Sequence, residues 1–167
     1  ELYDADLHQQ SYDYLKTAVS RANSDQERAE FYWRFSRATL EVGDIEVLDG
    51  ASTEDLLKRF LEGEEYADIA LELEPDNHEA YYWKSANIGR WAETKGILNS
   101  LFKARPMREL LRTALGYYPG HASSFYVLGI MYERVPGFPI SFGNANYAVS
   151  LARKSIDANH EEIAAGI

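Results

Sequence analysis

The sequence predicts an all-α fold in which about seven or eight helices stack as antiparallel hairpins, and three observations predict it. Apolar residues recur at helical spacing along nearly the whole chain, without the sustained alternation that indicates strands. Capping residues, glycines and prolines divide this pattern into segments of helical length. Finally, a small residue followed by an aliphatic one and a helix stop occurs four times, at intervals of about 40 to 50 residues.

The first helix is expected over about residues 4–22. Its apolar stripe consists of Tyr12, Leu15, Val19 and Ala22. Ser24 followed three residues later by Glu27 is a capping-box signature, which predicts that a second helix begins there. We expect this second helix to end near Val42, because Gly43 follows and glycine commonly terminates helices.

The middle of the chain predicts two long helices and a short one. The third helix is expected to begin after Ser52 and to end before Pro75, since proline cannot continue a helix. Asn77 is a suitable cap for a fourth helix, which is expected to reach about Lys95. Gly96 then interrupts the pattern, and residues 97–104 are expected to form a short helical piece.

Three further helices are expected in the last third of the chain. Pro106 fits the first position of a helix, which should stop at Pro119. The next helix contains Leu128 and should close at the proline-rich segment 136–139. Asn144 is a suitable cap for the final helix.

The recurring pattern predicts one domain over residues 1–167, with a half-repeat helix in residues 1–23 and helical hairpins in 24–76, 77–120 and 121–160. The small-aliphatic pairs are Ala18-Val19, Ala70-Leu71, Ala114-Leu115 and Ser155-Ile156. The first three stops are followed by the aromatic clusters Phe31-Tyr32-Trp33, Tyr81-Tyr82-Trp83 and Phe125-Tyr126. A small residue lets paired helices approach, and an aromatic residue fills the space between successive hairpins.

The third hairpin resembles the tetratricopeptide repeat. The residues that carry the likeness are Phe125, Leu128, Gly129, Tyr132, Ala148, Ala152 and Ser155. A seven-residue insertion at Pro136–Phe142 departs from that pattern. The segment Tyr81–Gly143 is similar to a divergent branch that includes the T-component proteins of bacterial TRAP transport systems and the regulator-of-microtubule-dynamics proteins. The likeness begins near Glu27 and implies a tetratricopeptide-like α-solenoid.

Composition excludes several classes of function. The chain has 17 basic and 27 acidic residues, a formal net charge of −10, so binding to nucleic acid or to an anionic membrane is disfavoured. It contains no cysteine, which excludes disulfides, thiolate catalysis and Cys-ligated zinc. The longest uncharged stretch, Thr113–Tyr132, has Pro119-Gly120 within it, so we expect two helices there and no membrane span.

No enzymatic activity, cofactor or metal is expected. The four histidines are His8, His78, His121 and His160, and they lack the paired spacing of zinc ligands on one helix. The carboxylates between Glu62 and Glu74 lie opposite the apolar face of their helix, as on an ordinary solvated surface. The serines occur in no nucleophile-elbow motif.

The remaining candidate is a binding surface. In tetratricopeptide-like hairpins the first helix of each pair lines a concave groove. Aligning these helices gives the candidate partner-binding residues Trp33, Arg37, Trp83, Asn87, Arg90, Trp91, Tyr126 and Arg134. Aromatic residues flanked by arginines suit a peptide, a helix or a small anionic organic ligand. The tryptophans fit core filling equally well, because tryptophan is mostly buried.

The first functional hypothesis is therefore a non-enzymatic scaffold that binds another protein or peptide in this groove. The alternative, implied by the likeness to T-component proteins, is a ligand-binding accessory of a bacterial transport system in the periplasm. The first helix ends like the second helix of a hairpin whose own first helix is absent, and the sequence opens at Glu1. We expect its apolar stripe to form a homo-oligomer contact or to dock an upstream segment.

Overall fold

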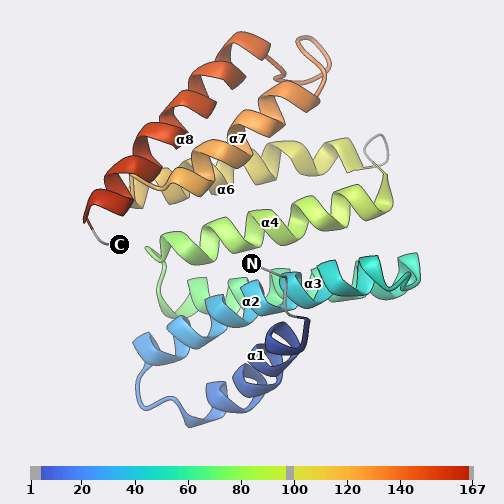
Figure 1. Ribbon diagram of the computed structural model, residues 1–167, viewed down its shortest axis with the longest axis vertical. Helices are drawn as coiled ribbons and strands as arrows, with labels where there is room; N and C mark the ends of the chain where they lie inside the picture. The colour runs from blue at the N-terminus through green and yellow to red at the C-terminus, as the bar shows by residue number, and fades with distance from the viewer. Residues whose placement is uncertain (1–4, 97–99, 166–167) are drawn as a thin grey trace.

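The computed structural model of the chain describes residues 5–96 and 100–165. Its elements, in order, are α1 (Ala5–Ala18), η1 (Val19–Arg21), α2 (Asp25–Leu48), α3 (Thr53–Leu73), α4 (His78–Lys95), η2 (Leu101–Lys103), α6 (Ala104–Tyr117), α7 (Ala122–Arg134) and α8 (Ala145–Ala165). Figure 1 shows the α-helices stacked in chain order from α1 to α8. The predicted all-α fold of stacked helices is confirmed, and the described residues contain no β-strand.

Most helices begin at the positions that the capping residues predict. The side chain of Ser24 accepts a hydrogen bond from the backbone N–H of Glu27, and that of Asn77 accepts one from Ala80. The expected end of the second helix is wrong, because α2 continues through Gly43 to Leu48. A Cβ atom at Gly43 would lie 2.5 Å from Phe60 Cε1, so the glycine allows close packing of α2 on α3.

The short helical piece expected before α6 is only partly described. Residues 97–99 lie outside the described residues, whereas Leu101–Lys103 form a 3₁₀ turn that leads directly into α6 at Ala104. Among the described residues, none of the helices has the length and apolar content needed to span a bilayer.

Helix α1 is covered by its own chain. Tyr12 and Leu15 are buried against Phe35, Ala38 and Val42 of α2. The phenol of Tyr12 also reaches α3, where it donates a hydrogen bond of 2.9 Å to Glu62 Oε1. The apolar stripe of α1 therefore packs on α2, and the expectation that this stripe needs an external cover is not met.

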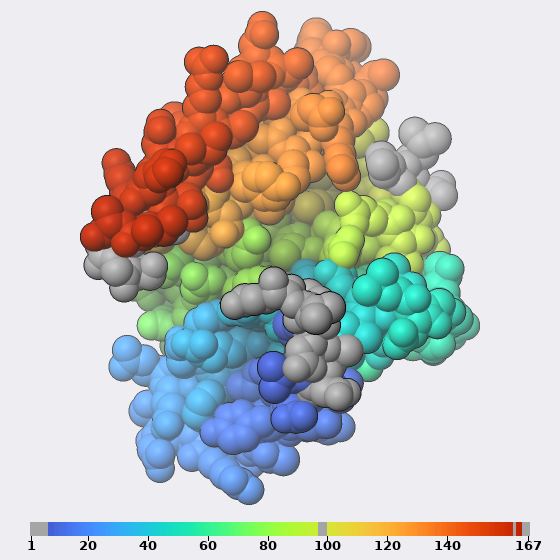
Figure 2. Space-filling model, in the orientation of Figure 1, coloured from blue at the N-terminus to red at the C-terminus, as the bar shows by residue number. Residues whose placement is uncertain are grey.

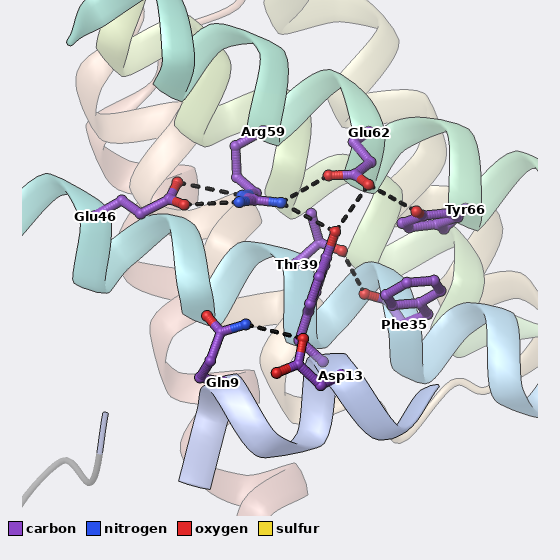
Figure 3. Close-up of polar contacts among 9 residues, drawn as sticks. Gln9, Asp13, Phe35, Thr39, Glu46, Arg59, Glu62 and Tyr66 are labelled. Carbon is purple, nitrogen blue, oxygen red and sulfur yellow. Dashed lines mark hydrogen bonds and ion pairs between the residues drawn. The ribbon is translucent and has the colours of Figure 1, made fainter. Parts of the chain in front are cut away.

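A network of hydrogen bonds and ion pairs connects α1, α2 and α3. Figure 3 shows Arg59 between Glu46 and Glu62, with the hydroxyl of Tyr66 directed at Glu62. Arg59 Nη1 also donates a hydrogen bond of 3.1 Å to the Tyr12 hydroxyl. Burial and the neighbouring Glu62 carboxylate raise the pKa of both tyrosines, so their hydroxyls remain proton donors.

Candidate functional site

A cleft of about 550 Å³ lies between α2, α4 and α7, with η2 and α6 contributing to its lining. Its apolar lining includes Leu40, Tyr82, Trp83, Leu101, Met107, Val127, Ile130 and Met131. The volume lies within the range of ordinary ligand pockets, and the lining is mostly hydrophobic, as such pockets require. The cleft can therefore accept several apolar side chains of a partner segment.

Four of the eight candidate residues line this cleft: Trp83, Arg90, Tyr126 and Arg134. They come from α4 and α7, the first helices of two successive pairs. Tyr126 has 59% of its surface exposed and is the most open aromatic residue of the cleft. The fold thus brings together candidate residues that are far apart in the sequence.

Trp33 and Arg37 lie outside the cleft lining. Trp33 is buried against Ala70 and Ala80, as the core-filling alternative expects. Its indole N–H donates a hydrogen bond to Glu30. The guanidinium of Arg37 lies 5.4 Å from the centre of the Trp83 ring and donates a 2.8 Å hydrogen bond to Glu41. Arg37 therefore borders the cleft through Trp83.

Asn87 and Trp91 are also outside the lining. Asn87 is fully buried, and its amide donates to both the carbonyl and the hydroxyl of Ser36. Trp91 is half-buried, with the ammonium of Lys103 lying 4.8 Å from its ring centre. Both side chains contribute to packing between helices.

A chain of ion pairs crosses one side of the cleft. Arg90 Nε donates a 2.7 Å hydrogen bond to Asp44 Oδ1, and Arg90 Nη1 donates one of 2.8 Å to Glu93 Oε2. Arg134 Nη1 lies 3.6 Å from Glu93 Oε1. Burial raises the pKa of the Asp44 carboxyl, while the Arg90 guanidinium opposes this shift. The charges on this side are therefore largely paired with one another.

The sequence patterns did not indicate the two acidic residues of these ion pairs, Asp44 and Glu93. One signal could have found Asp44: it precedes Arg90 by 46 residues, close to the repeat interval, so the two side chains lie on successive first helices within reach of each other. Opposite charges in that relation predict an ion pair between neighbouring hairpins.

The N-terminal ends of α4 and α7 bring two histidines together. The rings of His78 and His121 lie 5.5 Å apart, and His121 Nδ1 is 2.7 Å from the Ser124 hydroxyl. Burial, reinforced by His78, lowers the pKa of His121 to about 4, so this ring is neutral near pH 7. Within the described residues, no group of three or more His, Cys, Asp or Glu side chains is arranged to hold a metal ion.

Comparison with known proteins identifies the family. The family model described as "Regulator of microtubule dynamics protein 1-3" matches residues 1–134. The chain is 28% identical over 102 residues to regulator of microtubule dynamics protein 3 of Bos taurus, and 30% identical over 101 residues to that of Xenopus laevis. These matches cover 61% and 60% of this chain, but 21% of each relative.

These relatives correct the expected location. A bacterial periplasmic location is wrong, because both relatives are proteins of eukaryotes, which have no bacterial periplasm. Neither the family description nor the two names refers to transport, so the alternative of a transport accessory gains no support. Of the two groups that the sequence resembles, the match selects one: the chain belongs to the regulator of microtubule dynamics protein family.

Proposed function

We propose that the chain is a non-enzymatic, tetratricopeptide-like interaction module that docks a segment of a partner protein in the cleft between α2, α4 and α7. The observation that carries this proposal is the cleft itself, with an apolar lining assembled from several helices. The relatives are named as regulators of microtubule dynamics, and regulation through protein contacts needs a binding surface. We extend that role to this chain.

The chemistry of the cleft favours an amphipathic helix as the partner segment. Helix-binding grooves accept a row of apolar side chains, and the lining supplies Met107, Ile130 and Met131 for such a row. The paired charges of Arg90 and Asp44 leave little net charge to attract an ionic ligand. We assign the partner contacts to Trp83, Arg90, Tyr126 and Arg134, and supporting roles to Trp33, Arg37 and Asn87.

The test measures whether the chain changes microtubule assembly, using purified tubulin and turbidity as the readout. We expect the parent chain to change the rate of assembly, and Ile130→Asp to remove the effect, because a carboxylate in the cleft would lose hydration on binding. Leu48→Asp, at an exposed leucine outside the cleft, should behave like the parent. If Ile130→Asp retains the full effect while folded, or the parent has none, the proposal is wrong.

A further inference from the structure

Trp83 is the largest side chain in the lining of the cleft, where its ring is half-buried. It belongs to α4, and Figure 2 shows part of α4 at the surface between α2 and α7. Large aromatic side chains often supply much of the affinity at a binding surface. They do so at the least cost when the free protein already holds them in the bound orientation. The groups that hold the Trp83 ring therefore influence what the cleft can bind.

Glu79 holds the edge of this ring. The indole Nε1 of Trp83 donates a 3.0 Å hydrogen bond to Glu79 Oε2. The two residues are four positions apart, so they lie one turn from each other on the same face of α4. A hydrogen bond to a carboxylate is stronger than one between neutral groups. Glu79 also lies in the first turn of α4, where a negative charge is favoured. The indole edge is therefore directed toward the start of α4.

Two histidines face the other oxygen of the Glu79 carboxylate. His78 Nε2 and His121 Nε2 each lie 3.7 Å from Glu79 Oε1. His121, at the start of α7, is buried, and its Nδ1 contacts the Ser124 hydroxyl, so its ring has little freedom to turn. Groups from both α4 and α7 therefore surround the carboxylate on the side of Oε1 and leave Oε2 for the indole.

Arg37 of α2 covers the face of the same ring. Its guanidinium carbon lies 5.4 Å from the centre of the Trp83 ring, within the range of a cation–π contact. Arg37 Nε donates a 2.8 Å hydrogen bond to Glu41 Oε1, and Glu41 Oε2 lies 2.9 Å from His8 Nδ1 of α1. The ring is therefore held at its edge from α4 and on its face from α2. Both Glu79 and Arg37 lie outside the lining of the cleft.

The internal repeat contains a second pair of this kind, which serves as a comparison. In α2, the indole Nε1 of Trp33 donates a 2.6 Å hydrogen bond to Glu30 Oε2. Trp33 is buried in the core and lies outside the lining of the cleft. The pair of Glu30 and Trp33 therefore has the same chemistry as the pair of Glu79 and Trp83, but its ring cannot meet a partner in the cleft.

We propose that Glu79 is a positioning residue, which fixes the orientation of Trp83 in the wall of the cleft and thereby sets the affinity for the partner segment without touching it. The effect on affinity rests on the function proposed above for the cleft. The effect on the orientation of the ring does not, because it depends only on contacts within the chain.

The orientation is tested by fluorine NMR of the chain labelled with 5-fluorotryptophan. The chain has three tryptophans, so three resonances are expected, and replacing each tryptophan with phenylalanine assigns them. Glu79→Ala should shift or broaden the resonance of Trp83. Glu79→Gln should restore it, because the amide oxygen of glutamine also accepts a hydrogen bond. Glu30→Ala should move the resonance of Trp33 and leave that of Trp83 in place.

The affinity is tested by the tubulin turbidity assay, with variants that circular dichroism shows to be folded. Glu79→Ala should need about two- to tenfold more protein for half of the parent's effect, whereas Glu79→Gln and Glu30→Ala should act like the parent. Glutamine lacks the charge favoured in the first turn, so a purely electrostatic role of Glu79 would impair Glu79→Gln as much as Glu79→Ala.

Three results would overturn the proposal: an unchanged Trp83 resonance in Glu79→Ala, equal impairment of Glu79→Gln and Glu79→Ala, or a Glu79→Ala variant that acts at the parent's concentration. In the last case the parent still changes assembly, so the proposed function stands while this inference fails. If the parent has no effect on assembly, the proposed function fails and the effect on affinity fails with it, whereas the Trp83 resonance still decides whether Glu79 orients the ring.

Discussion

Replacing Gly63 with alanine tests how closely α3 and α4 pack. A Cβ atom at Gly63 would lie 2.1 Å from Asn87 Oδ1 and 2.4 Å from Asn87 Cγ, so the amide would have to move by more than 1 Å to reach ordinary contact. Asn87 is fully buried, and its amide donates hydrogen bonds of 3.0–3.1 Å to Ser36 and to the carbonyl of Trp83. Moving it therefore sacrifices buried hydrogen bonds as well as space.

The opposing contributions can be compared. Overpacking costs about 1–3 kcal/mol, and the disturbed hydrogen bonds cost about 1–3 kcal/mol more. Alanine gains about 1 kcal/mol over glycine in a helix interior. We expect Gly63→Ala to lower the free energy of unfolding by about 1–5 kcal/mol, which corresponds to a fall in melting temperature of roughly 2–20 °C for a chain of this size.

The assay is urea denaturation followed by circular dichroism. Gly116→Ala in α6 is the matched control, because nothing lies within 4 Å of its added Cβ atom, and it should stabilise the chain by about 0.5–1 kcal/mol. Combining Gly63→Ala with Asn87→Ala should be less harmful than the sum of the single changes, by about 1 kcal/mol or more. A Gly63→Ala variant as stable as the parent would refute the packing argument.

Three other predictions concern stability. Ala70→Leu, at a fully buried position, should cost about 1–3 kcal/mol in urea denaturation; an unchanged midpoint would contradict the burial. Tyr12→Phe removes the hydroxyl between Glu62 and Arg59 and should cost about 1–2 kcal/mol, with faster hydrogen exchange in α1. His121 has its pKa lowered to about 4, so the unfolded chain takes up the proton first as pH falls. Stability should fall by at most about 3 kcal/mol between pH 6.5 and 4, and His121→Asn should flatten this dependence in denaturation series across that range.

The start signals of helices were predictable from local chemistry, but the end of α2 was not. Ser24, Ser52 and Asn77 each cap a helix through a side-chain oxygen, an interaction that involves only neighbouring residues. Gly43 has the residue type of a helix end, yet its role is decided by Phe60 on another helix. A single sequence does not distinguish a glycine that ends a helix from one that admits a neighbour.

For a similar reason, the sequence indicated only part of the cleft: four of the eight candidate residues line it. Aligning the first helices selected Trp83 and Tyr126, and both line the cleft. The same alignment treated Asn87 as equivalent to Arg37, whereas Asn87 is buried and Arg37 is exposed. The difference follows from Gly63, because the Asn87 amide lies where a Cβ atom at that position would be. Alignment of the repeats predicts where the backbone of a residue lies. Whether its side chain is buried or exposed depends on the neighbouring helix.

The ends of the stack show what the repeat pattern leaves undetermined. Val19 and Ile156 occupy the same position of the pattern, and yet Val19 packs on α2 while Ile156 is exposed. The two residues differ because a described helix follows Val19, whereas none follows Ile156 among the described residues. The residue type alone does not predict this difference. The position of an aliphatic residue in the repeat therefore does not by itself determine whether its side chain is buried.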